Sequence, residues 1–222
     1  MGDSAVLDLE MYSKSDAARL LGVAPQTLGR WLDGYTAADG TRRPPILGVE
    51  PVAGDSSTPR FVTWGEFIEA GHLAAYRGFQ RMRLRKLRKY ASIWQRSCDV
   101  PYPLARRKLC TTPGSHLNDN GTVTAESVTA FFDRIDFEGD IPVRYWPDGR
   151  DAHIVVDPRR QFGAPIIEGT RMGTEVLHGM YTAGDPAEWL AHAYSLDLVQ
   201  VEAAIRFEQR LANRKIIAYQ AA

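Results

Sequence analysis

Hydrophobic residues recur at helical spacing in two short stretches of "YSKSDAARLLGVAPQTLGRWLDGY", close to the N terminus. An apolar residue at every third or fourth position predicts an amphipathic helix. Ser13 is a typical N-cap, Gly22 can end the first helix, and Pro25 suits the first turn of a second helix. The inward face of the second helix consists of Leu28, Trp31 and Leu32.

Two short helices joined by a tight turn predict a helix-turn-helix, whose second helix can enter the major groove of DNA. Its N-terminal half would present Gln26, Thr27 and Arg30 outward, where they can reach base edges or phosphates. Lys14 would add a phosphate contact from the first helix. The alternative is an ordinary helical hairpin packed inside a core.

The next segment changes to short apolar pieces around 46–47 and 61–62, separated by Gly, Pro and Ser residues. Such a pattern predicts a small β wing. Arg42 and Arg43 would lie on this wing and contact phosphate, or else form a solvated pair in a loop. Thr63 and Glu66 have the spacing of a capping box at the start of a further helix.

The helix predicted around "RMRLRKLRKYASIWQRS" has an apolar stripe and a strongly basic outer face. The chain has 222 residues and no formal net charge, yet residues 71–108 hold eleven basic residues against one acid, Asp99. Such an asymmetry favours a polyanionic partner, with Arg83 and Arg85 as phosphate contacts. A solvated or internally neutralised surface is the alternative.

Residues 101–151 alternate turn signals with short strand-like runs and predict a small mixed connector. Residues 143–146 and 153–156 would pair as a hairpin, a turn would form at 119–121, and a short helix would span 127–135. Three helices would follow, over 174–181, after an N-cap at Asp185, and after an N-cap at Asp197. The last would bury Leu198, Val201, Ile205, and Leu211 or Ala212.

No pattern in the sequence predicts catalysis or a metal site. The five histidines match no HExxH or His–Cys spacing, and no GxSxG occurs. The acids of "DRIDFEGD" are expected to be solvated. The sequence therefore predicts a protein that is not an enzyme and needs no cofactor. Two cysteines, no apolar run of about 18 residues and no signal-like N terminus favour a cytoplasmic location.

Two resemblances extend this interpretation. The stretch "AARLLGVAPQTLGRW" and the segment after it resemble the winged helix-turn-helix of MerR-like proteins. The stretch from "IVVDPRRQFGAPIIEGTRM" to "AAIRFE" resembles the domain-of-unknown-function family numbered 433, in which a strand leads to Gly-x-Pro, an apolar pair, Gly-Thr-Arg and a set of helices. The matching residues are Gly163, Pro165, Ile166, Gly169, Thr170, Arg171, Gly184, Leu196, Val201 and Ala204.

This chain departs from that family pattern at 172–174, where Met, Gly and Thr follow Gly-Thr-Arg. The loop 160–172 has neither a GxGxxG nor a GK[ST] ending, so a structural turn is expected, with a partner contact or a ligand site as alternatives. Ile166 and Ile167 would enter the helical core, and Thr170 or Arg171 would cap or brace the next helix.

The combined resemblance implies a VapB-type antitoxin, a homodimer that binds its own operator DNA and neutralises a PIN-domain ribonuclease toxin. One candidate for the toxin contact is the set of cations of the last helix, Arg206, Arg210, Arg214 and Lys215. The alternatives are a stand-alone MerR-like regulator and a protein–protein adaptor. The predicted fold is mainly α with short β elements: a winged head with its basic helix at 1–100, a connector at 101–151 and a three-helix domain at 152–222.

Overall fold

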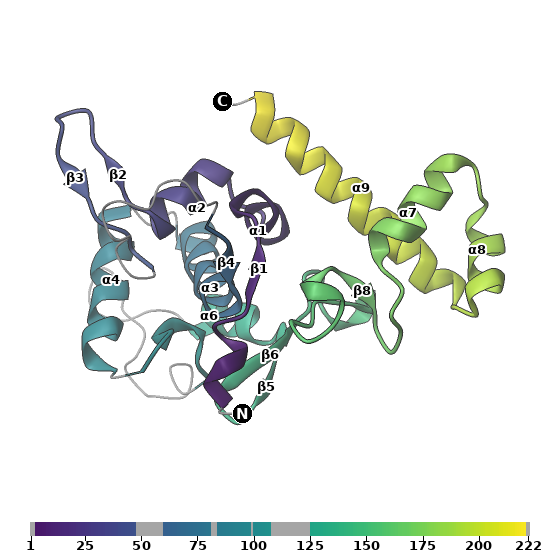
Figure 1. The fold of residues 1–222 in the computed structure, drawn as a ribbon, viewed down its shortest axis with the longest axis horizontal. Helices are drawn as coiled ribbons and strands as arrows, with labels where there is room; N and C mark the ends of the chain where they lie inside the picture. The colour runs from purple at the N-terminus through teal and green to yellow at the C-terminus, as the bar shows by residue number, and fades with distance from the viewer. Residues whose placement is uncertain (1–2, 48–59, 81–83, 99, 108–124, 221–222) are drawn as a thin grey trace. The chain divides into compact units, whose positions relative to one another are not determined.

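The computed structural model describes residues 3–47, 60–80, 84–98, 100–107 and 125–220 (Figure 1). The fold is mainly helical with short two-stranded antiparallel sheets, which confirms the predicted fold class. The chain divides into two compact units: unit 1 is Met1–Asp133 with Phe137–Pro142, and unit 2 is Arg134–Asp136 with Val143–Ala222. The three-part division at 100 and 151 stays a prediction.

Unit 1 is built from helices and from pairs of very short strands. Its helices are α1 (Lys14–Leu21), α2 (Pro25–Leu32), α3 (Trp64–Gln80), α4 (Leu84–Ser97) and α6 (Ala125–Phe132), with 3-10 turns η1 (Asp3–Val6) and η2 (Pro103–Ala105). Its strands are β1 (Glu10–Tyr12), β2 (Tyr35–Thr36), β3 (Arg42–Arg43) and β4 (Val62–Thr63). β1 pairs with β4 and β2 pairs with β3, both antiparallel. A further pair, β5 (Ile135–Glu138) and β6 (Ile141–Tyr145), contains the boundary between the units.

Helix α3 is the centre of unit 1, and α1, α2, α6 and η2 all pack on it. It starts at the predicted capping box: Glu66 N–H donates to Thr63 Oγ1 at 3.2 Å, and Thr63 N–H donates to the Glu66 carboxylate at 3.1 Å. Trp64 and Phe67 are fully buried, and Tyr12 of β1 lies 4.9 Å from the Phe67 ring. These aromatic contacts hold the β1–β4 pair against the helix.

The predicted helix-turn-helix is present as α1 and α2. Ser13 accepts a hydrogen bond from Asp16 N–H, as an N-cap does. Gly22 ends α1 at φ 68°, a left-handed conformation that glycine adopts without steric cost. Leu28 and Trp31 are fully buried, so α2 is anchored by the face that the sequence predicts.

The wing differs from its prediction. Its strands are β2 and β3 rather than the apolar pieces at 46–47 and 61–62, and this hairpin extends away from the helices (Figure 1). Ile46 and Leu47 are buried, and both donate a backbone N–H to the Trp31 carbonyl, at 2.7 and 2.9 Å. Pro44 and Pro45 explain this, because proline has no N–H for a strand ladder and ends β3. Residues 48–59 lie outside the described residues.

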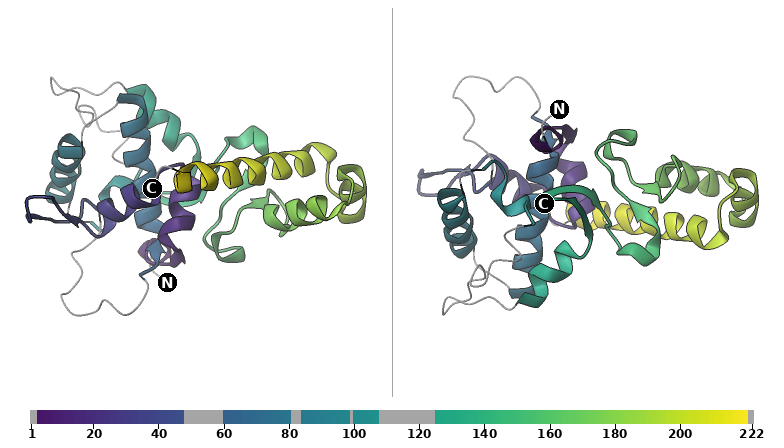
Figure 2. Two further views of the ribbon diagram at one scale, coloured as in Figure 1. Left: turned by 90° about the horizontal axis from the view of Figure 1, so that it is seen from above. Right: turned by 90° about the horizontal axis from the view of Figure 1, so that it is seen from below.

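Unit 2 contains the 3-10 turns η3 (Arg150–Ala152) and η4 (Gln161–Gly163), the antiparallel pair β7 (Ile154–Val155) and β8 (Ile166–Ile167), and helices α7 (Thr174–Ala183), α8 (Ala187–Tyr194) and α9 (Leu198–Gln220). Both views of Figure 2 show α7 alongside α9. Side chains alternate across a strand, so the two isoleucines of β8 enter different clusters. Ile167 joins Leu177, Leu190 and Val201 of the helices, whereas Ile166 packs with Trp146 and Val155.

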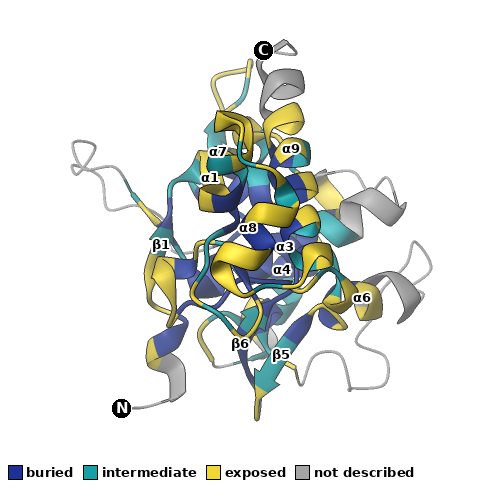
Figure 3. Ribbon diagram, turned by 90° about the vertical axis from the view of Figure 1, so that its right-hand side faces the viewer, coloured by how far each residue is buried: buried dark blue, intermediate teal, exposed yellow. Residues whose placement is uncertain are grey.

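Several local predictions for the chain after residue 124 are wrong or hold only in part. The predicted pairing of 143–146 with 153–156 is present only in part: Tyr145 and Val156 form one antiparallel bridge and exchange both backbone hydrogen bonds, at 2.9 and 2.8 Å, whereas β6 pairs with β5 and β7 pairs with β8. The N-cap of α8 is Pro186 rather than Asp185, and α6 ends at Phe132. Leu198, which the sequence predicts to be buried by the last helix, is exposed. The outward side of α8 is exposed as well (Figure 3). The turn predicted at 119–121 lies outside the described residues.

The acids expected to be solvated include two that form ion pairs. Asp136 pairs with Arg150 at 2.6 Å, and Asp140 pairs with Arg106 at 3.7 Å. Among the described residues, no group of three or more His, Cys, Asp or Glu side chains is placed to hold a metal ion. Within the same residues no helix is long and apolar enough to cross a membrane.

Candidate nucleic-acid interface

The leading end of α2 is exposed on unit 1. Gln26 and Arg30 are exposed and Thr27 is half-buried, while Leu28 and Trp31 on the opposite side are sealed in the core. The three predicted base-contacting side chains therefore share the outer side of one short, anchored helix. This is the arrangement that a recognition helix requires.

The N terminus of α2 also leaves a backbone donor open. Pro25 occupies the first turn and has no N–H, and Ala24 at the N-cap supplies no side-chain hydrogen bond. Thr27 N–H bonds to the Ala24 carbonyl at 2.9 Å, and the described residues offer Gln26 N–H no such partner. Open N–H groups at a helix N terminus favour anions, phosphate included.

Arg30 contacts an aromatic ring, and the residues that the structure describes include no carboxylate paired with it. Its guanidinium lies 5.3 Å from the ring centre of Tyr35, the first residue of β2. A cation–π contact orients a guanidinium but leaves its charge uncompensated. Tyr35 has no place in the predicted site; its position three residues after the end of α2 is the signal for it in the sequence.

Asp33 is a second residue of this surface that the hydrophobic pattern does not predict. Its carboxylate pairs with Lys14 at 2.5 Å and with Arg60 at 3.4 Å, and its carbonyl accepts a hydrogen bond from Arg42 at 2.6 Å. Arg60 also pairs with the buried Glu66. This network joins α1, α2, β3 and α3, and so fixes the recognition helix relative to the hairpin.

The predicted phosphate contacts are placed in different ways. Lys14 is half-buried in its ion pair with Asp33, so the Asp33 carboxylate neutralises part of its charge. Arg42 and Arg43 are exposed on β3, and Arg43 lies 3.9 Å from Asp39. Hydrogen bonds from Thr41 hold the pKa of the exposed Asp39 below its usual value. The hairpin therefore carries two guanidiniums and one ionised carboxylate.

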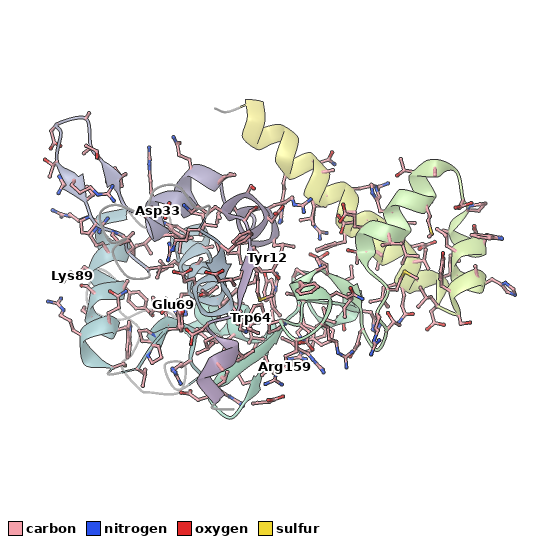
Figure 4. The ribbon with its side chains drawn as sticks, in the orientation of Figure 1. Tyr12, Asp33, Trp64, Glu69, Lys89 and Arg159 are labelled. Carbon is pink, nitrogen blue, oxygen red and sulfur yellow. The ribbon has the colours of Figure 1, made fainter. Side chains whose placement is uncertain are left out.

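Helix α4 adds a basic face. Arg85, Lys86 and Lys89 are exposed, and Lys89 points outward in Figure 4, while Leu87 and Ala91 are buried. Arg88 donates to the carbonyls of Pro44 and Pro45 at 2.5 and 3.2 Å. This contact ties α4 to the base of the hairpin, so both belong to one surface of unit 1. Arg83 lies outside the described residues.

The predicted toxin-binding cations of α9 are more strongly neutralised. Arg210 pairs with Asp148 and stacks 5.3 Å from the Phe207 ring centre, and Arg206 pairs with Glu202 at 3.3 Å. Arg214 is exposed, and the side chain of Lys215 is outside the described set. Their role stays a prediction.

The loop 160–172 is structural in part. Thr170 Oγ1 donates to the Ile167 carbonyl at 2.9 Å and accepts from Met172 N–H at 3.0 Å, so it closes the turn after β8. Neither Thr170 nor Arg171 caps α7, whose N-cap is Gly173 without a side-chain hydrogen bond. The first residue of α7, Thr174, is instead buried and donates to Glu208 of α9.

Unit 1 thus combines a helix-turn-helix, a following β-hairpin and a basic helix, and unit 2 contains the segment with the family pattern. Residues 154–207 match the model of the family described as "Protein of unknown function (DUF433)". The match begins at β7 and ends within α9, so it covers most of the hydrophobic core of unit 2.

Relatives from Mycobacterium tuberculosis match nearly the whole chain. The chain is 29% identical to "Uncharacterized protein Rv2308", over 98% of each chain. It is 26% identical to "Putative antitoxin VapB45", over 89% of this chain and 93% of that protein. The crystal structure of Rv2018 from the same organism has a similar fold, with a TM-score of 0.68 and 23% identity over 90% of this chain and 99% of that one.

Proposed function

We propose that the protein is the antitoxin of a toxin–antitoxin pair, which binds its own operator DNA through unit 1 and a PIN-domain ribonuclease toxin through unit 2. The observation that carries the DNA-binding half is the exposed leading end of α2, with Gln26 and Arg30 outward and a buried opposite face. The name of a relative that matches along most of its length, "Putative antitoxin VapB45", supports the toxin-binding half.

In this proposal α2 lies in the major groove. Gln26 and Arg30 contact base edges, the Gln26 backbone N–H contacts a phosphate, and Arg42 and Arg43 follow the adjacent backbone. Arg85 and Lys89 of α4 add sequence-independent attraction that weakens with salt. A homodimer would place two such heads on a palindromic operator.

The DNA-binding half is tested by an electrophoretic shift with the DNA upstream of the protein's own gene. We expect the protein to shift this DNA. An unrelated duplex of equal length, added at the same concentration as the upstream DNA, should not abolish the shift. The shift should weaken steeply between about 50 and 200 mM salt, because phosphate contacts release counterions. A protein that binds both duplexes equally, or neither, is not an operator-binding regulator.

The toxin-binding half is tested by co-expression with the product of the adjacent gene. We expect that product to arrest growth when expressed alone, and to co-purify with this chain when both are present. A specific DNA shift without any co-purifying partner would favour a stand-alone regulator. Co-purification without a DNA shift would favour an adaptor.

A further inference from the structure

The turn η4 of unit 2 holds one aromatic side chain almost entirely in solvent. Phe162 is 92% exposed, and no other large hydrophobic residue that the structure describes is exposed to this extent. Single exposed apolar residues are common on protein surfaces and by themselves mean little. Phe162 differs because its backbone is unusual as well.

Three consecutive residues of this turn have left-handed backbone angles. The φ angles are 46° at Gln161, 50° at Phe162 and 73° at Gly163. Only the glycine adopts such an angle without steric cost, and a bulky residue there is an outlier. Glycine at 162 would relieve the strain. Because the phenyl group is almost fully exposed, its packing does not offset this strain. Retained strain of this kind is typical of functional turns.

The turn is held rigidly in this conformation. Gly163 N–H donates to the Arg160 carbonyl at 2.8 Å, and Ala164 N–H donates to the Gln161 carbonyl at 2.9 Å. On one side the buried Asp157 accepts from Arg159 N–H at 2.9 Å. On the other side Gln161 Nε2 donates to the Arg171 carbonyl at 3.4 Å. Phe162 is therefore preorganised, which lowers the entropy that a partner must remove on binding.

Exposed arginines flank the turn. Arg159 and Arg160 directly precede it, and Arg171, whose carbonyl accepts from Gln161, follows it. Arg160 lies 3.7 Å from Asp157, which Arg144 also approaches at 3.3 Å. An aromatic anchor with a guanidinium rim has the composition of a protein-binding hot spot.

We propose that Phe162 is the anchor by which unit 2 binds its protein partner, filling an apolar pocket whose rim carries a carboxylate that faces Arg171. This inference rests on the proposed function, because it takes the toxin as the partner. A protein pocket fits better than single-stranded nucleic acid, which requires a continuous cationic groove and several stacking rings. The turn itself carries one ring, and Asp157 offsets part of the local positive charge through its pairs with Arg144 and Arg160.

The test uses the full chain and, as probe, the purified product of the adjacent gene, with the dissociation constant measured by calorimetry. We expect Phe162→Ala to weaken binding more than about tenfold. Val199→Ala is the matched control, because Val199 of α9 is 63% exposed and also apolar. That variant should bind as the wild type does. The melting temperature of Phe162→Ala should equal or exceed that of the wild type, since the phenyl group buries almost nothing.

A second variant separates the side chain from the backbone. Gln161→Gly keeps the phenyl group but relaxes the turn, and we expect it to weaken binding by several-fold through the lost preorganisation. If Phe162→Ala binds the partner as tightly as the wild type does, Phe162 is not the anchor, but the proposed function still stands. If the wild type binds no adjacent gene product, the proposed function fails and the anchor fails with it. A Phe162→Ala variant that loses the operator shift but keeps the partner would make the turn a nucleic-acid element and overturn the anchor.

Discussion

The two units distribute their charges in different ways. In unit 1 the carboxylates of Glu66 and Glu69 are buried along α3, and Arg30 is exposed against an aromatic ring. In unit 2 two arginines of α9 face surface carboxylates, Arg206 with Glu202 and Arg210 with Asp148. A chain with no net charge can therefore still present a cationic surface on one unit. Attraction for a polyanion is expected from unit 1 and not from unit 2.

The largest expected effect comes from breaking the scaffold of the recognition helix. Trp31→Ala removes a fully buried ring from the core face of α2 and should cost about 3–5 kcal/mol. That is comparable with the stability of a small domain, so the operator shift should disappear. Denaturant unfolding and the shift assay measure the two effects.

The matched control for Trp31→Ala lies in the core of unit 2. Leu190 is also fully buried, and Leu190→Ala should cost about 2–5 kcal/mol. It should weaken binding of the adjacent gene product but leave the operator shift intact at low temperature. Equal loss of the shift in both variants would show that the two units do not divide the functions as proposed.

The second effect concerns the interior carboxylates. Burial raises the pKa of Glu69 from 4.5 to about 8, against a hydrogen bond from Leu104 N–H, and the charge of Glu66 raises it further. The folded state therefore keeps a proton that the unfolded state loses above pH 4.5. The stability that this proton supplies is complete below pH 4.5 and is lost as the pH rises to about 8. The loss is on the order of a few kcal/mol, since each pKa unit corresponds to about 1.4 kcal/mol.

Glu69→Gln tests this pH dependence. Glutamine is neutral at every pH and keeps an oxygen that can accept the Leu104 N–H. We expect its melting temperature to exceed that of the wild type at pH 8 and to match it at pH 4. Melting curves of the two proteins that stay parallel over this range would mean that Glu69 has an ordinary pKa.

The helix-turn-helix was predictable because its signals are local. Ser13, Gly22 and Pro25 each have a conformational preference that acts within one turn of helix. The hairpin was not predictable in this way, because Arg42 and Arg43 form a strand with both side chains exposed and no apolar alternation. The β1–β4 pair joins Tyr12 to Val62, and only the tertiary fold brings such distant residues together.

The same distinction applies to the candidate site. The outward positions of Gln26 and Arg30 follow from the helical period, since Leu28 and Trp31 define the buried side. The ion pairs of Asp33 do not follow from any period, because Lys14 and Arg60 approach it from different elements. Nor does the strained backbone at Phe162 have a local signal: phenylalanine disfavours that angle, and only the surrounding hydrogen bonds impose it.

The third effect is on base recognition. Arg30→Ala should weaken operator binding by about 1–3 kcal/mol and reduce discrimination at one base pair, because Arg30 is the cation best placed to reach a base edge. Arg206→Ala is the control on unit 2, being exposed on a helix but paired with Glu202. It should leave the shift unchanged. An Arg30→Ala protein that binds every operator variant as tightly as the wild type does would remove α2 from base recognition.

The smallest effect distinguishes phosphate contacts from base contacts. Arg85 is exposed on α4, and the described residues contain no carboxylate paired with it. Arg85→Ala should weaken binding to specific and unrelated DNA alike, by less than about 1 kcal/mol at physiological salt, and should lower the slope of log K against log salt by about one. Arg214→Ala, which removes an exposed arginine from α9 of unit 2, should leave that slope unchanged. Titrations at four salt concentrations resolve such a change. Equal slopes for wild type and Arg85→Ala would mean that α4 does not contact the DNA backbone. The DNA-binding surface of unit 1 would then end at the hairpin.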